Sequence, residues 1–152
     1  MRSLSISVLV CVLCLVPAFP ALSDEAQDCE TLVKKCLTLF QEQGKEPALK
    51  AINDPKGPFI KGDIYVFALD MENKVLAHPY DKALLRMTMS NVIDANGQRF
   101  FVKFKEVAEK SGSGWVGYTW AKPGQEGAKP KSTYITKVPG DELYIGAGYY
   151  LK

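Results

Sequence analysis

The segment DIYVFALD, residues 63–70, carries apolar side chains at every position between its two aspartates. Alternate residues of a β-strand point to opposite faces of a sheet, so this strand is apolar on both faces. An antiparallel sheet leaves one face in water unless another layer covers it. The segment therefore predicts a strand inside a sheet that has a further layer packed on each side.

The surrounding segments can supply both layers. Apolar residues recur at helical spacing from Asp24 to Gly44, and a shorter helix is predicted at 46–54, before the breaker PKGPF. After a polar turn, residues 74–79 return as a second strand and form a hairpin. The remaining pattern predicts one helix at 100–112 and strands at 114–122, 131–138 and 142–151. We expect an α+β fold: a five-stranded antiparallel sheet, with the long N-terminal helix on one face and a lid of helix and loop, residues 80–112, on the other.

The first 23 residues have the pattern of a secretory signal. Arg2 precedes an uncharged apolar run at 4–16, and Ala21–Ser23 form a small-x-small cleavage site. We predict that residues 1–23 are removed on export, which leaves one domain at 24–152 in a secreted or periplasmic location. The alternative is an uncleaved membrane anchor, although the run is shorter than the roughly 20 residues that a spanning helix needs.

Charge and residue types exclude several classes of function. Removal of residues 1–23 takes away only Arg2 and lowers the net charge from +2 to +1. This balance gives no reason to expect nucleic acid or a membrane surface as partner. One histidine cannot build a typical metal site, and no catalytic triad or phosphate loop is recognisable. We therefore expect a protein without catalysis, metal or cofactor, and an enzyme is the least favoured alternative.

Cys29 and Cys36 are the two cysteines that remain after the signal. Seven residues along a helix place them on one face about 10 Å apart, too far for a disulfide within a straight helix. They are either two small buried residues, or they form a bridge between two chains or between the halves of a broken helix.

Four blocks of this sequence together resemble the single Cache domain family. They are GDIYVFALDMENKVLAHP (62–79), DANGQRF (94–100), GWVGYTWAKP (114–123) and KSTYITKVPGDELYIGAGYY (131–150). The resemblance implies a PAS-like extracytoplasmic sensor domain that binds a small molecule, often a carboxylate or an amino compound. It further implies a free-standing exported member whose partner is a membrane receptor or sensor kinase, and a homodimer is possible. The lid stretch YDKALLRMTMSNVI, 80–93, departs from the family pattern and leaves the ligand class open.

The candidate ligand-binding residues combine aromatic walls with polar anchors. Tyr118 and Trp120 share one face of their strand, and nearby glycines could turn Trp115 to join them. The anchors are His78, Arg86 in the lid, and Lys131, which matches the lysine that precedes S-x-Y in the family. Tyr65 and Tyr134 are further wall candidates. If these residues are instead ordinary core and surface, the protein is a structural or interaction protein with a vestigial pocket.

Two further groups of residues have a predicted structural role. Gly146 and Gly148 alternate on the last strand, and their missing side chains leave room for a ligand or for a closely packed helix. Asp94, Asn96 and Gly97 are residue types that favour a turn, and they are predicted to form one. They offer too few oxygen ligands for a metal site.

Overall fold

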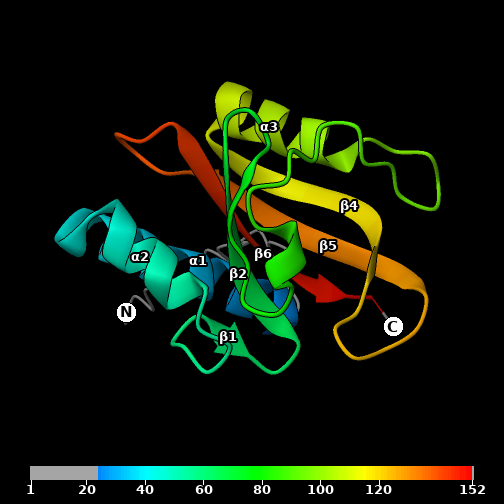
Figure 1. Cartoon of the computed structure of the whole chain (residues 1–152), viewed down its shortest axis with the longest axis horizontal. Helices are drawn as coiled ribbons and strands as arrows, with labels where there is room; N and C mark the ends of the chain where they lie inside the picture. The colour runs from blue at the N-terminus through cyan, green and yellow to red at the C-terminus, as the bar shows by residue number, and fades with distance from the viewer. Residues whose placement is uncertain (1–23, 152) are drawn as a thin grey trace, which may run out of the picture.

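The computed structural model describes residues 24–151, so the predicted signal peptide lies outside the described residues. Three layers make up the molecule: helices, a sheet, and a lid with a further helix (Figure 1). The sheet is antiparallel and its strands lie in the order β1-β2-β6-β5-β4, with β3 paired to β2. Its strands are β1 (Ile60–Lys61), β2 (Ile64–Asp70), β3 (Val75–Ala77), β4 (Ser113–Ala121), β5 (Ala128–Lys137) and β6 (Leu143–Tyr150). None of the described helices is long and apolar enough to cross a membrane.

Both faces of β2 are covered, as the apolar pattern predicts. Val66 and its neighbours at 64 and 68 belong to the core under the N-terminal helices. Tyr65, Phe67 and Leu69 point to the opposite face and belong to the core under the lid and the third helix. Since β6 pairs with β2 along six residues, the two cores are separated by the middle of the sheet.

The helix α1 (Asp24–Gln43) covers the first face, and the short α2 (Lys45–Ile52) follows it. Cys29 and Cys36 lie on the buried side of an unbroken α1, and both thiols are free and fully buried. They are therefore small core residues. A bridge between two halves of the helix is wrong, and a bridge between chains would need α1 to leave the sheet.

The lid, residues 80–112, covers the second face as predicted, and the helix α3 (Phe100–Ser111) forms its last part. The lid contains a short 3-10 helix, η1 (Lys82–Leu84), which lies in front of β2 in Figure 1. The number of strands differs from the expected five, because Ile60–Lys61 pair with β2 and add a sixth. A strand of two residues is too short to show a period in the sequence.

Candidate functional site

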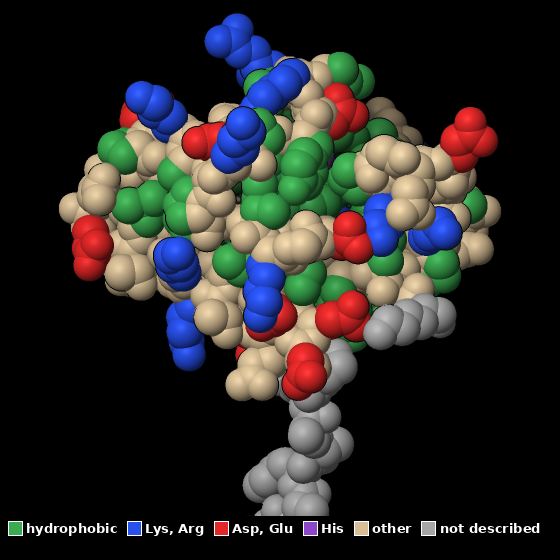
Figure 2. All heavy atoms as spheres, turned by 90° about the horizontal axis from the view of Figure 1, so that it is seen from below, with side chains coloured by type: hydrophobic (Ala, Val, Ile, Leu, Met, Phe, Trp, Pro, Cys, Tyr) green, Lys and Arg blue, Asp and Glu red, His purple; other side chains and the backbone are tan. Residues whose placement is uncertain are grey.

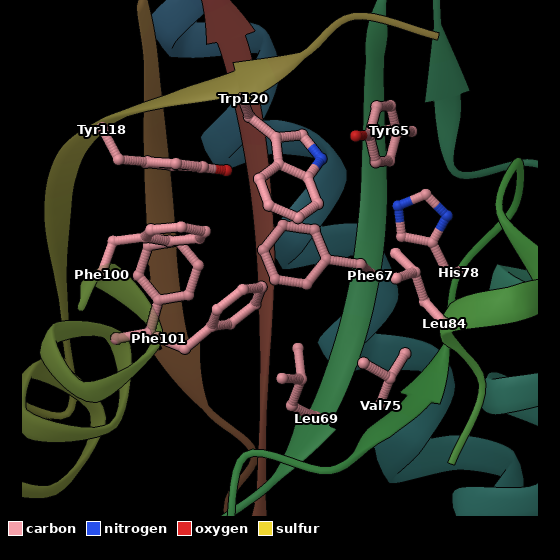
Figure 3. A pocket seen from close by; sticks show the side chains of 11 residues that line it. Tyr65, Phe67, Leu69, Val75, His78, Leu84, Phe100, Phe101, Tyr118 and Trp120 are labelled. Atoms are coloured by element: carbon pink, nitrogen blue, oxygen red, sulfur yellow. The ribbon is translucent and has the colours of Figure 1, made fainter. Parts of the chain in front are cut away.

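Two connected hollows lie between β2, β4 and the lid. They share four lining residues: Tyr65, His78, Leu84 and Trp120. The inner chamber is completed by apolar and aromatic side chains, namely Phe67, Leu69, Val75, Phe100, Phe101, Phe104 and Tyr118 (Figure 3). The outer groove is completed by Tyr80, Asp81 and residues 121–125 of the β4–β5 connection.

The two hollows differ greatly in size. The inner chamber has a cavity volume of about 20 Å³, which is room for about one water molecule. The outer groove has a volume of about 490 Å³, within the range of small-molecule sites. It lies at the end of the molecule where the β4–β5 connection and β1 are seen in Figure 1. Viewed from that end, hydrophobic side chains gather in the middle and charged ones lie around them (Figure 2).

His78 presents one nitrogen to the place where the hollows meet. Its Nδ1 accepts hydrogen bonds from the backbone N–H groups of Tyr80 (3.3 Å) and Asp81 (2.9 Å). The neutral ring therefore carries its proton on Nε2. Burial, followed by the positive charge of Lys131, lowers the pKa of His78 to about 4. At neutral pH His78 is thus an uncharged donor, and Figure 3 shows its ring facing Trp120.

Trp120 supplies a second donor. Phe100 and Phe101 hold its ring edge-to-face, with ring centroids 5.4 and 5.9 Å away. In Figure 3 its indole nitrogen points toward Tyr65 and His78. Trp120 is half-buried and lines both hollows, and no hydrogen bond joins its N–H to another of residues 24–151. The two N–H groups of Trp120 and His78 therefore face the same space.

Lys131 lies behind these donors, on the same face of the sheet. Its side chain is only 1% exposed, and its Nζ donates a hydrogen bond of 3.0 Å to the hydroxyl of Tyr65. The rings of Tyr65 and Tyr150 flank it, with centroids 4.1 and 4.7 Å from Nζ. Burial lowers the pKa of Lys131 to about 7. No ion pair within the described chain includes Lys131, so a buried amine lacks an anion here.

The profile of the family "Single Cache domain 2" matches residues 30–152. The chain belongs to the single Cache domain family. Cache domains are ligand-binding sensor domains, and as a class they are not catalytic. This chain is therefore a ligand-binding sensor domain.

Solved structures similar to this Cache domain show the same PAS-like fold. The periplasmic sensor domain of a chemotaxis protein is 24% identical, with a TM-score of 0.69 over 84% of this chain and 95% of that one. A Cache chemosensory domain from work on carboxylic acid recognition is 23% identical, with a TM-score of 0.68 over 83% and 88%. A methyl-accepting chemotaxis protein from Vibrio parahaemolyticus is 19% identical, with a TM-score of 0.70 over 82% and 87%.

The structure brings five of the eight candidate residues of this Cache domain together. Tyr65, His78, Tyr118 and Trp120 line the hollows, and Lys131 contacts Tyr65 from behind. The hydroxyl of Tyr118 is 3.0 Å from that of Thr133, and its ring stacks on Phe100, with centroids 4.2 Å apart.

The other three candidates lie elsewhere. Trp115 and Tyr134 pack against each other on the opposite face, beside the core under α1. The neighbouring glycines do not turn Trp115, because β4 and β5 pair without a bulge at this point. Arg86 is exposed and lines neither hollow.

The glycines of β6 make room for the protein's own side chains rather than for a ligand or a helix. A Cβ atom at Gly146 would lie 2.7 Å from Cζ of Phe67, and one at Gly148 would meet Thr133 and Lys131. Sequence reasoning had missed Phe67 as a lining residue. Its parity with Tyr65 on the same strand was the signal that could have found it.

The predicted turn at 94–97 is present and has a second role. The backbone N–H of Gly97 bonds to the carbonyl of Asp94, and Gly97 has φ 77°, which favours glycine. The Asp94 carboxylate also accepts a 3.0 Å hydrogen bond from the backbone N–H of Thr119. Asp94 thereby fastens the lid to β4 directly beside Trp120. Within residues 24–151 no group of three His, Cys, Asp or Glu side chains could hold a metal ion.

Proposed function

We propose that this Cache domain is a non-catalytic sensor domain that binds a small carboxylate at the junction of the two hollows. The observation that carries the proposal is the buried amine of Lys131, which has no anionic partner among the described residues. A buried charge is costly unless it is paired. Lys131 lines neither hollow, so a carboxylate at the junction would interact with its amine through the hydroxyl of Tyr65, to which Lys131 donates. The relative solved in work on carboxylic acid recognition supports this ligand class.

The donors around the junction favour an acid over an amine. The free N–H groups of His78 and Trp120 can donate to carboxylate oxygens, and the neutral His78 adds no charge that must be buried. An amine would need acceptors. Asp81 is the acidic residue that lines the outer groove, and its carboxylate is already bonded to the backbone N–H of Ala83.

A vestigial pocket is the second candidate, and the small inner chamber favours it. Its own aromatic side chains fill most of the space, leaving about 20 Å³. The two candidates differ in one measurable property. A working site binds a ligand and gains stability from it, whereas a vestigial site does not.

Binding is tested with the protein lacking residues 1–23, by thermal shift and titration calorimetry against sodium salts of short acids and against matched amines. A ligand at about 100 times its Kd stabilises the folded state by about 2.7 kcal/mol. We expect at least one acid to stabilise the protein and the amines to leave it unchanged. If no acid binds, the carboxylate proposal is wrong and the vestigial pocket is favoured.

The variant Trp120→Phe locates the binding. It keeps most of the ring packing but removes the indole N–H, so we expect affinity for the acid to fall by about 1–2 kcal/mol, roughly five- to thirtyfold. Trp115→Phe is the matched control, because Trp115 lies on the opposite face and should not affect affinity. Equal affinity in both variants would place the site away from Trp120.

We further propose that the protein is exported and loses residues 1–23. The three-part pattern of the segment supports this, as does the periplasmic sensor domain among its structural relatives. Mass spectrometry of the protein purified from its native source should then show a chain that begins at Asp24. A chain that retains Met1 and sediments with membranes would instead indicate an anchor. We also propose a membrane receptor as the partner, which the chemotaxis proteins among the relatives support, with a sensor kinase as the alternative.

A further inference from the structure

We propose that Asn53, at the end of α2, is a positioning residue that holds His78 in place in the site. The inference rests on the proposed function, because it takes the Nε2–H of His78 to be one of the two donors that face the ligand. Asn53 lines neither hollow, so it acts through His78 and not on the ligand. It follows a helix that packs on the other face of the sheet.

The main chain of His78 is held at both of its polar groups. The strand β3 ends at Ala77, so the N–H of His78 lies beyond the strand pairing. This N–H donates a hydrogen bond of 3.1 Å to Oδ1 of Asn53. The carbonyl of His78 accepts a hydrogen bond of 3.3 Å from Nζ of Lys82, which also donates to the carbonyl of Asn53. These three bonds tie the end of α2, the end of β3 and η1 into one polar cluster.

The direction of the His78 ring depends on this cluster. Its Nδ1 accepts the N–H groups of Tyr80 and Asp81, which fixes the ring relative to the turn at 78–81. Those bonds do not fix the turn relative to the rest of the molecule, and Asn53 supplies that attachment. Within residues 24–151, Nε2 is then the polar atom of His78 that no hydrogen bond engages.

Asn53 can hold His78 because its own position is fixed. Its backbone N–H donates a 3.0 Å hydrogen bond to the carbonyl of Leu49, which caps α2. The residue before Asn53 is Ile52 and the residue before His78 is Ala77, and both are fully buried in the core under α1. A close-packed core resists relative movement of its parts. The hydrogen bond therefore joins two points that already have a fixed separation.

The variant Asn53→Ala removes the acceptor and leaves every lining residue in place. By calorimetry with sodium acetate and sodium propionate, we expect affinity to fall about fivefold, because one donor loses its fixed direction. Ile52→Val is the matched control, since it loosens the same end of α2 but keeps the hydrogen bond, and it should keep the wild-type affinity. In a His78→Ala background, Asn53→Ala should cause no further loss, because its effect passes through His78.

The ring of His78 gives a second readout, which needs no ligand. His78 is the only histidine in the chain, so proton NMR follows its titration without interference. Burial, followed by the charge of Lys131, lowers the pKa of His78 to about 4, while Asp81 raises it and Lys82 lowers it. All three charges remain in Asn53→Ala. A ring released from its buried place should therefore titrate closer to the usual pKa of about 6.5, whereas the control variant should keep the wild-type midpoint.

The inference is overturned if Asn53→Ala leaves either the affinity or the midpoint of His78 unchanged. An equal loss of affinity in Ile52→Val, or a further loss in the His78→Ala background, also overturns it. If Asn53→Ala does not fold, Asn53→Ser serves the same test, because its shorter side chain cannot reach the N–H of His78. If the wild type binds neither acid, the proposed function fails for these probes, and the midpoint alone decides whether Asn53 positions the ring.

Discussion

Lys131→Met is expected to make the protein more stable at neutral pH, by roughly 2–4 kcal/mol, because it removes a buried amine and keeps most of the side-chain volume. The hydrogen bond to Tyr65 is lost in the variant, which reduces the gain. The two tyrosine rings that face Nζ stabilise the ammonium form and reduce it further.

The same residue should give the wild type a distinctive dependence on pH. Burial lowers the pKa of Lys131 to about 7 in the folded protein, against about 10.4 in the unfolded chain. Between these values the unfolded chain holds a proton that the folded protein lacks. Stability therefore rises with pH from about 7 to about 10, with a slope of up to about 1.4 kcal/mol per pH unit.

Urea unfolding at pH 7, 8, 9 and 10 measures this slope, which should disappear in Lys131→Met. Lys129→Met is the control, because Lys129 is exposed on the same strand and should keep the wild-type slope. An identical slope in the wild type and in Lys131→Met would show that the buried amine does not titrate in this range.

Lys131→Met should also lower the affinity for an acid at least tenfold, while the variant gains stability. A carboxylate favours the ammonium form, so binding to the wild type takes up a proton above pH 7, and affinity falls as pH rises from there. A variant that is more stable yet binds more weakly separates a binding role from a structural one. Unchanged affinity would make Lys131 an ordinary core residue.

Gly148→Ala is expected to destabilise the protein by about 3 kcal/mol, one of the largest effects of adding a single methyl group to this chain. A Cβ atom at Gly148 would contact the Thr133 hydroxyl and would lie 2.7 Å from the backbone oxygen of Ser132 and 2.9 Å from Cε of Lys131. The backbone oxygen cannot move without disturbing the pairing of β5 with β6.

Gly117→Ala on β4 is the matched control for this effect. A Cβ atom at Gly117 would have no other heavy atom within 4 Å, so its effect should stay within about 0.5 kcal/mol. Urea unfolding of both variants gives the comparison. If Gly148→Ala is as stable as Gly117→Ala, the close packing around Lys131 is not as tight as the structure shows.

The sequence by itself determined the layers of this protein. The unbroken apolar run at 64–69 required cover on both faces, and the helical period at 24–44 and 100–112 identified the helices that give it. Local periodicity reports which side chains of one element share a face, and this is enough to pair Tyr118 with Trp120. It also shows that a straight α1 cannot bridge its own cysteines.

Only the tertiary structure decided which faces of different strands are the same face. Tyr134 lies opposite the site because the long-range register of β2, β6, β5 and β4 puts Tyr65, Lys131 and Tyr118 on one side of the sheet. Register depends on pairing between segments that are distant in the sequence, which no local pattern encodes. For the same reason the burial of Lys131 came from packing rather than from residue type.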